Sequence, residues 1–172
     1  LFLPGNTPNM LVNGDTLGAD TIIFDLEDAV SPDEKDAARI LVRNALRYQS
    51  PDNCETAARI NPTDTAFWKA DLKAVIPLKP DVIMPTKVNG AAMIQEVSAY
   101  MAQVEKKAGI EEGTVKILPL IETALGVEKS FEIASADKRV IGIFLGGEDS
   151  TADMHCKRTK EGKEIFYART RL

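Results

Sequence analysis

Short apolar segments alternate with helix-like segments along the whole chain, and this alternation constrains the fold more than any other feature of the sequence. The apolar segments are too short and too continuous to be amphipathic helices, so they are predicted strands. They cover residues 1–3, 21–26, 56–60, 81–84, 115–121 and 140–145. The intervening segments carry apolar residues at helical spacing and are predicted helices over 35–48, 64–76, 91–108, 127–135 and 161–171.

Six strand–helix units in succession predict an α/β fold with parallel strands and right-handed crossovers. The strands are apolar on both faces, as in a sheet that helices or a closed interior cover on each side. A doubly wound sheet and a (β/α)₈ barrel both satisfy this pattern. No Gly-x-Gly-x-x-Gly follows a strand, which removes the main support for a dinucleotide-binding fold.

The positions of the polar residues favour the (β/α)₈ TIM barrel. Polar and glycine residues follow the carboxyl ends of the predicted strands, which is the face where barrel enzymes carry their sites. Six units do not close an eight-stranded barrel. We therefore expect residues 1–172 to be a single, incomplete TIM-barrel domain, covering about the first six βα units of a longer polypeptide.

Composition excludes several classes of protein. The 172 residues are 44% apolar and carry a formal charge of −5, with no basic cluster suited to a phosphate backbone, so nucleic acid is not an expected partner. No apolar run approaches the length of a membrane span and no signal peptide is evident, so we expect a cytoplasmic protein. Two cysteines without metal-type spacing are expected to be reduced.

Two acidic residues follow neighbouring strands in the same relative position. Glu122 comes directly after the fifth predicted strand and Asp149 shortly after the sixth. Carboxylate oxygens of this kind suit Mg²⁺, which takes one or two carboxylates and leaves positions for water and substrate. The alternative is a helix N-cap role for each acid, which explains one of them more easily than both. We expect Glu122 and Asp149 to be metal ligands.

Arg59 and Glu27 are candidate catalytic residues beside this metal site. Arg59 ends an otherwise apolar strand, where its planar guanidinium suits a substrate carboxylate; the alternative is a structural ion pair with Glu27 or Glu122. Glu27 is predicted to accept hydrogen bonds from the waters of the metal. Asp28 is expected to be solvated, and Lys87 is equally compatible with anion steering and with an ordinary surface position.

Seven motifs in this order resemble the HpcH/HpaI aldolase family and, within it, the citrate lyase beta subunits. Each motif is weak alone, but their joint order and spacing over essentially the whole chain are specific. They are Leu1-Phe2-Leu3-Pro4-Gly5, Phe24-Asp25-Leu26-Glu27-Asp28-Ala29-Val30, Glu34-Lys35-Asp36-x-Ala38-Arg39, Arg59-Ile60-Asn61, Ile121-Glu122-x-x-x-Gly126, Gly146-x-Glu148-Asp149 and Phe166-Tyr167-Ala168-Arg169.

The resemblance implies a (β/α)₈ barrel that forms a homotrimer or hexamer, alone or with other lyase subunits, and that uses Mg²⁺ beside a thioester. It implies that Glu122 and Asp149 bind the metal and that Arg59 holds the substrate's carboxylate or carbonyl. Pro4 and Gly5 would lie along the pantetheine arm. Apart from the resemblance, the pair Gly146-Gly147 is consistent with close approach of the backbone to a substrate, although glycine pairs also occur in ordinary turns. The chain departs from the family in lacking units seven and eight and in carrying Thr86 between Pro85 and Lys87.

The expected activity is a Mg²⁺-dependent carbon–carbon lyase that cleaves a citryl thioester, citryl-ACP or citryl-CoA, to oxaloacetate and an acetyl thioester. The alternatives are a malyl-CoA or citramalyl-CoA lyase on the same barrel and a noncatalytic assembly subunit. The neutral segment 6–13 favours the prosthetic group of an acyl carrier protein over free CoA, unless Lys35 or Arg39 serves the nucleotide phosphates.

Overall fold

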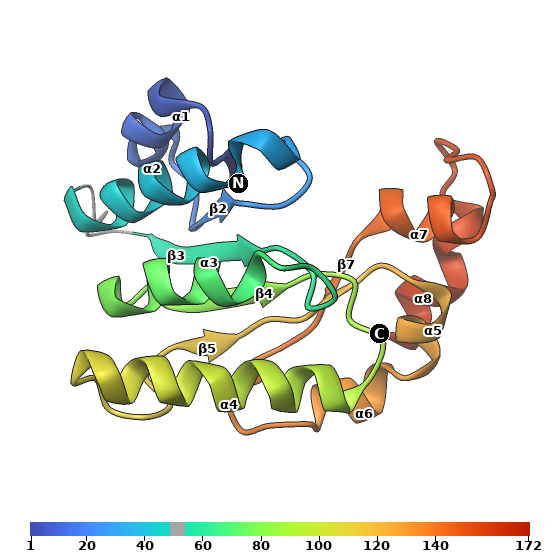
Figure 1. Ribbon diagram of the computed structural model, residues 1–172. Helices are drawn as coiled ribbons and strands as arrows, with labels where there is room; N and C mark the ends of the chain where they lie inside the picture. Colours follow the sequence, from blue (N-terminus) through green and yellow to red (C-terminus); the bar gives the residue numbers. More distant parts are fainter. Residues whose placement is uncertain (49–53) are drawn as a thin grey trace.

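A computed structural model describes residues 1–48 and 54–172 of the chain. Its main element is a parallel five-stranded sheet in the order β1-β2-β3-β4-β5, with each strand beside its neighbour in sequence (Figure 1). The strands are β1 (Phe2–Pro4), β2 (Thr21–Asp25), β3 (Glu55–Ile60), β4 (Val82–Pro85) and β5 (Lys116–Ile117). The predicted parallel α/β sheet is therefore confirmed.

The fifth and sixth predicted strands are shorter than expected. Residues 115–121 form two pieces, β5 and β6 (Leu120–Ile121), and residues 140–145 form only β7 (Phe144–Leu145). Pro119 lies between β5 and β6 and has no N–H to donate to a ladder. β6 and β7 pair in a second small parallel sheet, and a bridge from Ile117 to Val140 links it to the first.

The strands form an open arc within the part of the chain that the structure describes. β1 pairs only with β2, and β7 pairs only with β6. The two ends of the arc nevertheless meet through side chains, because the rings of Phe2 and Phe144 contact each other edge to face with centroids 6.2 Å apart. The sheet is thus strongly curved, with one face turned inward.

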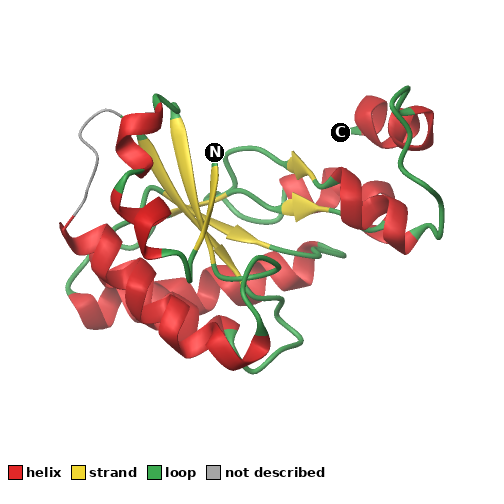
Figure 2. Ribbon diagram, turned by 90° about the horizontal axis from the view of Figure 1, so that it is seen from above, coloured by secondary structure: helices red, strands yellow, loops and turns green. Residues whose placement is uncertain are grey.

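The long helices lie together against the outer face of the sheet (Figures 1 and 2). They are α2 (Lys35–Tyr48), α3 (Trp68–Val75) and α4 (Ala91–Ala108). The predicted bounds of α2 and α4 are confirmed, and Gly109 ends α4 in the left-handed conformation at φ 70°. α3 begins four residues later than predicted, because residues 64–67 are turns and bends, and it continues as the 3₁₀ turn Ile76–Leu78.

Shorter helices and 3₁₀ turns lie in the connections between strands and after β7. The predicted helix over 127–135 is two helices, which begin earlier because the Thr123 hydroxyl caps the first by accepting the Gly126 N–H at 3.0 Å. The predicted helix over 161–171 is a 3₁₀ turn followed by a short α-helix. The short elements are α1 (Pro8–Val12), η1 (Gly14–Leu17), η2 (Pro32–Glu34), α5 (Ala124–Glu128), α6 (Ser130–Ala134), α7 (Gly147–Asp153), η4 (Lys163–Ile165) and α8 (Phe166–Arg171).

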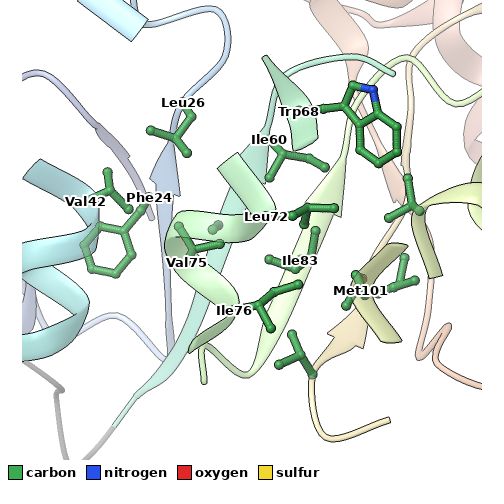
Figure 3. Packing of buried hydrophobic residues seen from close by; sticks show 14 of the residues in the cluster. Phe24, Leu26, Val42, Ile60, Trp68, Leu72, Val75, Ile76, Ile83 and Met101 are labelled. Atoms are coloured by element: carbon green, nitrogen blue, oxygen red, sulfur yellow. The ribbon is translucent and has the colours of Figure 1, made fainter. Parts of the chain in front are cut away.

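Apolar side chains cover both faces of the sheet, as the sequence predicted. Between the sheet and its helices, Phe24, Ile60 and Ile83 pack with side chains that include Val42, Leu72 and Met101 (Figure 3). The inward face carries a smaller cluster of Ile23, Ala57, Val82, Met84 and Leu120. Successive residues of a strand point to opposite faces, which is why β2, β3, β4 and β6 each supply both clusters. No helix of residues 1–48 and 54–172 has the length and apolarity to cross a bilayer.

A buried ion pair joins α4 to the segments around β5. Arg139 donates to both oxygens of Glu105, at 2.9 and 2.6 Å, and to the carbonyl of Val115 at 3.0 Å. The same carboxylate accepts the backbone N–H groups of Gly113 and Val115. This pairing lowers the pKa of Glu105 against the effect of its burial, so the carboxylate is held in its charged form.

Candidate active site

Charged side chains from five segments meet at the carboxyl ends of the strands. Parallel strands bring their carboxyl ends to one edge, so residues that are distant in sequence become neighbours there. Hydrogen bonds and ion pairs connect Asp25 at the end of β2, Glu27 and Asp28 just after it, Arg59 in β3, Lys87 after β4, Glu122 after β6 and Asp149 in α7. The predicted site residues Arg59, Glu27, Glu122 and Asp149 are therefore brought together.

Arg59 is held by Asp25, a residue that the sequence analysis did not single out. Its Nε and Nη2 donate to the two oxygens of Asp25 at 2.7 and 2.5 Å, and its guanidinium lies 5.0 Å from the ring centroid of Phe2. Of the two structural partners considered from sequence, Glu27 and Glu122, Glu27 does pair with Arg59 but lies further away than Asp25, with Oε2 at 3.3 Å from Nη1. Asp25 lies directly opposite Arg59 in the register of β2 against β3, so this contact can be predicted only once that register is known.

Asp25 also organises the turn that carries Glu27. Its carboxylate accepts the N–H of Glu27 at 2.8 Å and that of Ala29 at 3.3 Å. One side of the Arg59 guanidinium is thus fixed to β2, and its Nη1 end faces Glu27 and, at 3.9 Å, Asp28. Asp28 is half exposed, in agreement with the expectation of a solvated residue.

Glu27 is buried and incompletely paired. Its Oε1 accepts the ammonium of Lys87 at 2.5 Å, whereas Oε2 has an ionic neighbour in Arg59 but no hydrogen-bond donor. Burial raises the pKa of Glu27 against the opposing effect of Lys87. Oε2 is therefore an acceptor left open to a water or hydroxyl group in the site.

Glu122 and Asp149 lie on adjacent segments and neither is a helix N-cap. Thr123 caps α5, and Gly146 occupies the N-cap position of α7, which places Asp149 in the first turn. Glu122 is 3% exposed, and its Oε1 accepts the backbone N–H of Lys87 at 2.8 Å. The N-cap alternative from the sequence is therefore wrong for both acids.

Unbalanced negative charge surrounds Glu122. Burial raises the pKa of Glu122 to about 7. The hydrogen bond from the Lys87 N–H lowers that pKa, and the nearby carboxylates of Asp149 and Glu27 raise it further. A side chain at Gly146 would come within 2.7 Å of Glu122 Oε2, so this glycine leaves the space beside that oxygen free.

The donor set fits a hard cation with few protein ligands. Within residues 1–48 and 54–172, no group of three or more His, Cys, Asp or Glu side chains has the arrangement of a metal cage. Mg²⁺ does not require such a cage, because it is typically held by one or two carboxylates and completed by water and substrate oxygens. Glu122 and Asp149 therefore fit Mg²⁺ better than a cation that needs a full set of protein ligands.

The other predicted substrate-binding residues lie at the same end of the strands. Pro4 ends β1 opposite Asp25, and Gly5 donates its N–H to the Asp25 carbonyl at 2.8 Å. A side chain at Gly5 would come within 2.6 Å of that carbonyl, so this position requires glycine for packing. Gly147 begins α7 next to the guanidinium of Arg158. Contact of these three residues with substrate stays a prediction.

The raised pKa of Glu122 predicts a pH-dependent stability of the metal-free protein. Since the pKa rises from 4.5 to about 7 on folding, the associated stability is present below pH 4.5 and is lost as the pH rises through 7. Over this window we expect the unfolding free energy of the wild type to fall relative to Glu122→Gln by on the order of 3 kcal/mol. Urea unfolding in EDTA at several pH values measures this; parallel pH profiles of the two proteins would contradict it.

Comparison with known proteins identifies the family. The model of the family described as HpcH/HpaI aldolase/citrate lyase matches residues 1–172. The chain belongs to this family. It is 46% identical over 169 residues to the citrate lyase subunit beta of Leuconostoc mesenteroides subsp. cremoris, covering 98% of this chain and 56% of that protein. It is 40% identical to the citrate lyase subunit beta of Haemophilus influenzae, covering 98% of this chain and 58% of that protein. It thus spans a little more than half the length of these HpcH/HpaI relatives.

Solved structures of HpcH/HpaI relatives share the fold. The Mycobacterium tuberculosis citrate lyase beta subunit complexed with oxaloacetate and magnesium matches with a TM-score of 0.78 and 28% identity, over 99% of this chain and 70% of that one. The CitE protein of the same organism, in complex with magnesium, acetoacetate and coenzyme A, matches with a TM-score of 0.76 and 29% identity, over 99% and 57%. The resemblance to the HpcH/HpaI family stated from sequence is confirmed.

Proposed function

We propose that this chain carries the metal- and substrate-binding site of a Mg²⁺-dependent carbon–carbon lyase, which cleaves a citryl thioester to oxaloacetate and an acetyl thioester. We further propose that the arc of strands is part of a (β/α)₈ barrel that assembles as a homotrimer or hexamer. The observation that carries the proposal is the meeting of Glu122, Asp149 and Arg59 at one edge of the sheet. The citrate lyase beta subunits at 46% and 40% identity support the choice of reaction.

Each residue has a distinct task in this proposal. Glu122 and Asp149 would hold Mg²⁺, which supplies Lewis-acid stabilisation of the charge that develops on a keto-acid oxygen. Arg59, fixed on one side by Asp25, would bind the substrate's carboxylate through its Nη1 end, in exchange for the weaker contacts of that end with Glu27 and Asp28, and orient it. Glu27 keeps Oε2 open as an acceptor for a water or hydroxyl proton beside that carboxylate.

Lys87 is unsuited to act as the base. Its three carboxylate neighbours hold its pKa above the ordinary value for lysine, against the opposing effect of desolvation, so the ammonium keeps its proton at neutral pH. The same ammonium is already paired with Glu27, Asp28 and Asp149, which leaves little of its charge for a substrate anion. We therefore assign Lys87 neither proton transfer nor substrate binding.

The prosthetic group of an acyl carrier protein is the thioester that we favour over free CoA. Both cations that could have served nucleotide phosphates are engaged inside the fold. The Lys35 ammonium donates to the carbonyls of Leu26 and Glu27 at 2.8 and 2.7 Å. Arg39 pairs with Asp71 at 2.9 Å and also with Asp36.

A malyl-type CoA thioester is the second candidate substrate. The (3S)-malyl-CoA thioesterase of Cereibacter sphaeroides is 34% identical to this chain over 154 residues, covering 90% of this chain and 50% of that protein. The CitE complex with coenzyme A also supports CoA as the thioester. Parallel assays with citryl and malyl thioesters, each on CoA and on a carrier protein, separate the candidates.

Removing either proposed ligand is expected to abolish tight Mg²⁺ binding. In the complete natural protein, Glu122→Gln and Asp149→Asn should each weaken Mg²⁺ affinity by more than about tenfold, because each removes a charged oxygen ligand. Isothermal titration with MgCl₂ measures this, and oxaloacetate release from citryl thioester should fall in parallel. Glu148→Gln is the matched control, because its side chain is 82% exposed and pairs with Arg158. Unchanged affinity in both ligand variants would disprove the metal site.

A further inference from the structure

Lys87 occupies an unusual backbone position between the two proposed metal ligands. It follows β4 with φ at 52°, in the left-handed region that non-glycine residues rarely adopt. In this conformation its N–H donates to Glu122 Oε1 at 2.8 Å while its side chain extends toward β2 and α7. One residue therefore contacts both Glu122 and Asp149.

Among the residues that the structure describes, the partners of the Lys87 ammonium are all carboxylates. Nζ lies 2.5 Å from Glu27 Oε1, 3.5 Å from Asp28 Oδ1 and 3.3 Å from Asp149 Oδ2. These three acids come from two separate segments, so the ammonium bridges the turn after β2 and the first turn of α7. A single cation that gathers three carboxylates relieves repulsion that they would otherwise exert on one another.

The charge of the cluster remains negative even with this cation. Its acids are Asp25, Glu27, Asp28, Glu122 and Asp149, and the cations beside them are Arg59, Lys87 and Lys35, of which Lys35 donates to backbone carbonyls. Arg59 is committed to Asp25 by two hydrogen bonds, so Lys87 is the cation that faces Asp149. The oxygen of Asp149 that faces the ammonium belongs to a proposed Mg²⁺ ligand.

We propose that the Lys87 ammonium is the built-in counter-cation of the metal site, which pairs with Glu27 and Asp149 before Mg²⁺ binds and competes with Mg²⁺ for Asp149. This inference rests on the proposed metal site and extends it. Two cations that share one carboxylate repel each other, so Lys87 lowers the affinity for Mg²⁺. In return, it keeps the carboxylates gathered in the metal-free protein.

The test compares charge-removing and charge-retaining variants of Lys87 in the complete natural protein. We expect Lys87→Met and Lys87→Gln to bind Mg²⁺ about fivefold or more tightly, because the competing charge is gone. Lys87→Arg should bind within about twofold of the wild type. The probe is MgCl₂ in isothermal titration without substrate. Thermal unfolding without Mg²⁺ should show that both neutral variants are less stable than the wild type. When Mg²⁺ is added, both variants should gain more stability than the wild type gains.

The possible outcomes separate this inference from the proposed function. Unchanged or weaker Mg²⁺ binding in both neutral variants would overturn the counter-cation role, provided that Glu122→Gln still loses Mg²⁺. A lower affinity for oxaloacetate with unchanged Mg²⁺ affinity would also overturn it, because Lys87 would then be a substrate contact. Mg²⁺ binding that survives Glu122→Gln and Asp149→Asn would instead disprove the metal site itself.

Discussion

Replacing Glu105 with leucine is expected to lower the free energy of unfolding by about 3–5 kcal/mol, because it leaves a buried guanidinium without its carboxylate. Arg139 is 1% exposed and would keep only the carbonyl of Val115 as an acceptor. The backbone N–H groups of Gly113 and Val115 would also lose their acceptor. Urea unfolding monitored by circular dichroism measures the change.

Two further variants test the physical reason. Arg139→Met should cost less than Glu105→Leu, because Glu105 would retain two backbone N–H donors. Glu96→Gln is the matched surface control, since its pairing with Lys69 is 4.0 Å long and more than half exposed, and it should cost less than about 1 kcal/mol. A loss below 1 kcal/mol for Glu105→Leu would mean that the ion pair does not stabilise this end of the fold.

Arg59→Lys is expected to reduce kcat/KM for the thioester by at least about tenfold, or roughly 1.4 kcal/mol of transition-state stabilisation. Lysine keeps the charge, but its donors all lie on one nitrogen, so it lacks the planar fork that binds both oxygens of Asp25 while a separate nitrogen, Nη1, points elsewhere. Asp25→Asn should reduce activity as well, because it weakens the contacts that orient Arg59 without removing the arginine. Steady-state kinetics with the complete natural protein measure both variants.

Arg39→Lys is the control for this experiment. Arg39 and Arg59 have side chains that are each 13% exposed and each pair with a buried aspartate, but Arg39 pairs with Asp71, outside the site. We expect Arg39→Lys to change stability and leave kcat/KM near the wild-type value. Wild-type kcat/KM in Arg59→Lys would show that Arg59 serves only as a structural ion-pair residue.

The sequence predicts the parallel α/β sheet and the group of residues at its carboxyl edge, because both depend on local patterns. Strand periodicity located β1 to β4 well, and the position of Arg59, Glu122 and Asp149 after strands indicated that they would meet. The apolar pattern alone does not predict the break at Pro119, because the break depends on the missing N–H donor of proline. Whether Glu122 and Asp149 bind a metal stays a prediction.

The pairing of Asp25 with Arg59 could not be obtained from local patterns. It depends on the register of β2 against β3, which places the two residues opposite each other across the ladder. The bridging role of Lys87 likewise depends on a left-handed backbone conformation that propensity does not predict for lysine. In both cases the decisive contact joins residues that are distant in the chain.

The stacking of Arg59 on Phe2 has a consequence for how firmly the guanidinium is held. One face of the guanidinium lies against an aromatic ring, and that ring contacts Phe144 across the curved sheet. Apolar groups on that side exclude water and screen charge poorly, so the attraction between Arg59 and Asp25 is stronger there than it would be in solvent. The two phenylalanine side chains, which cannot form hydrogen bonds, thus help to fix the direction in which the guanidinium points.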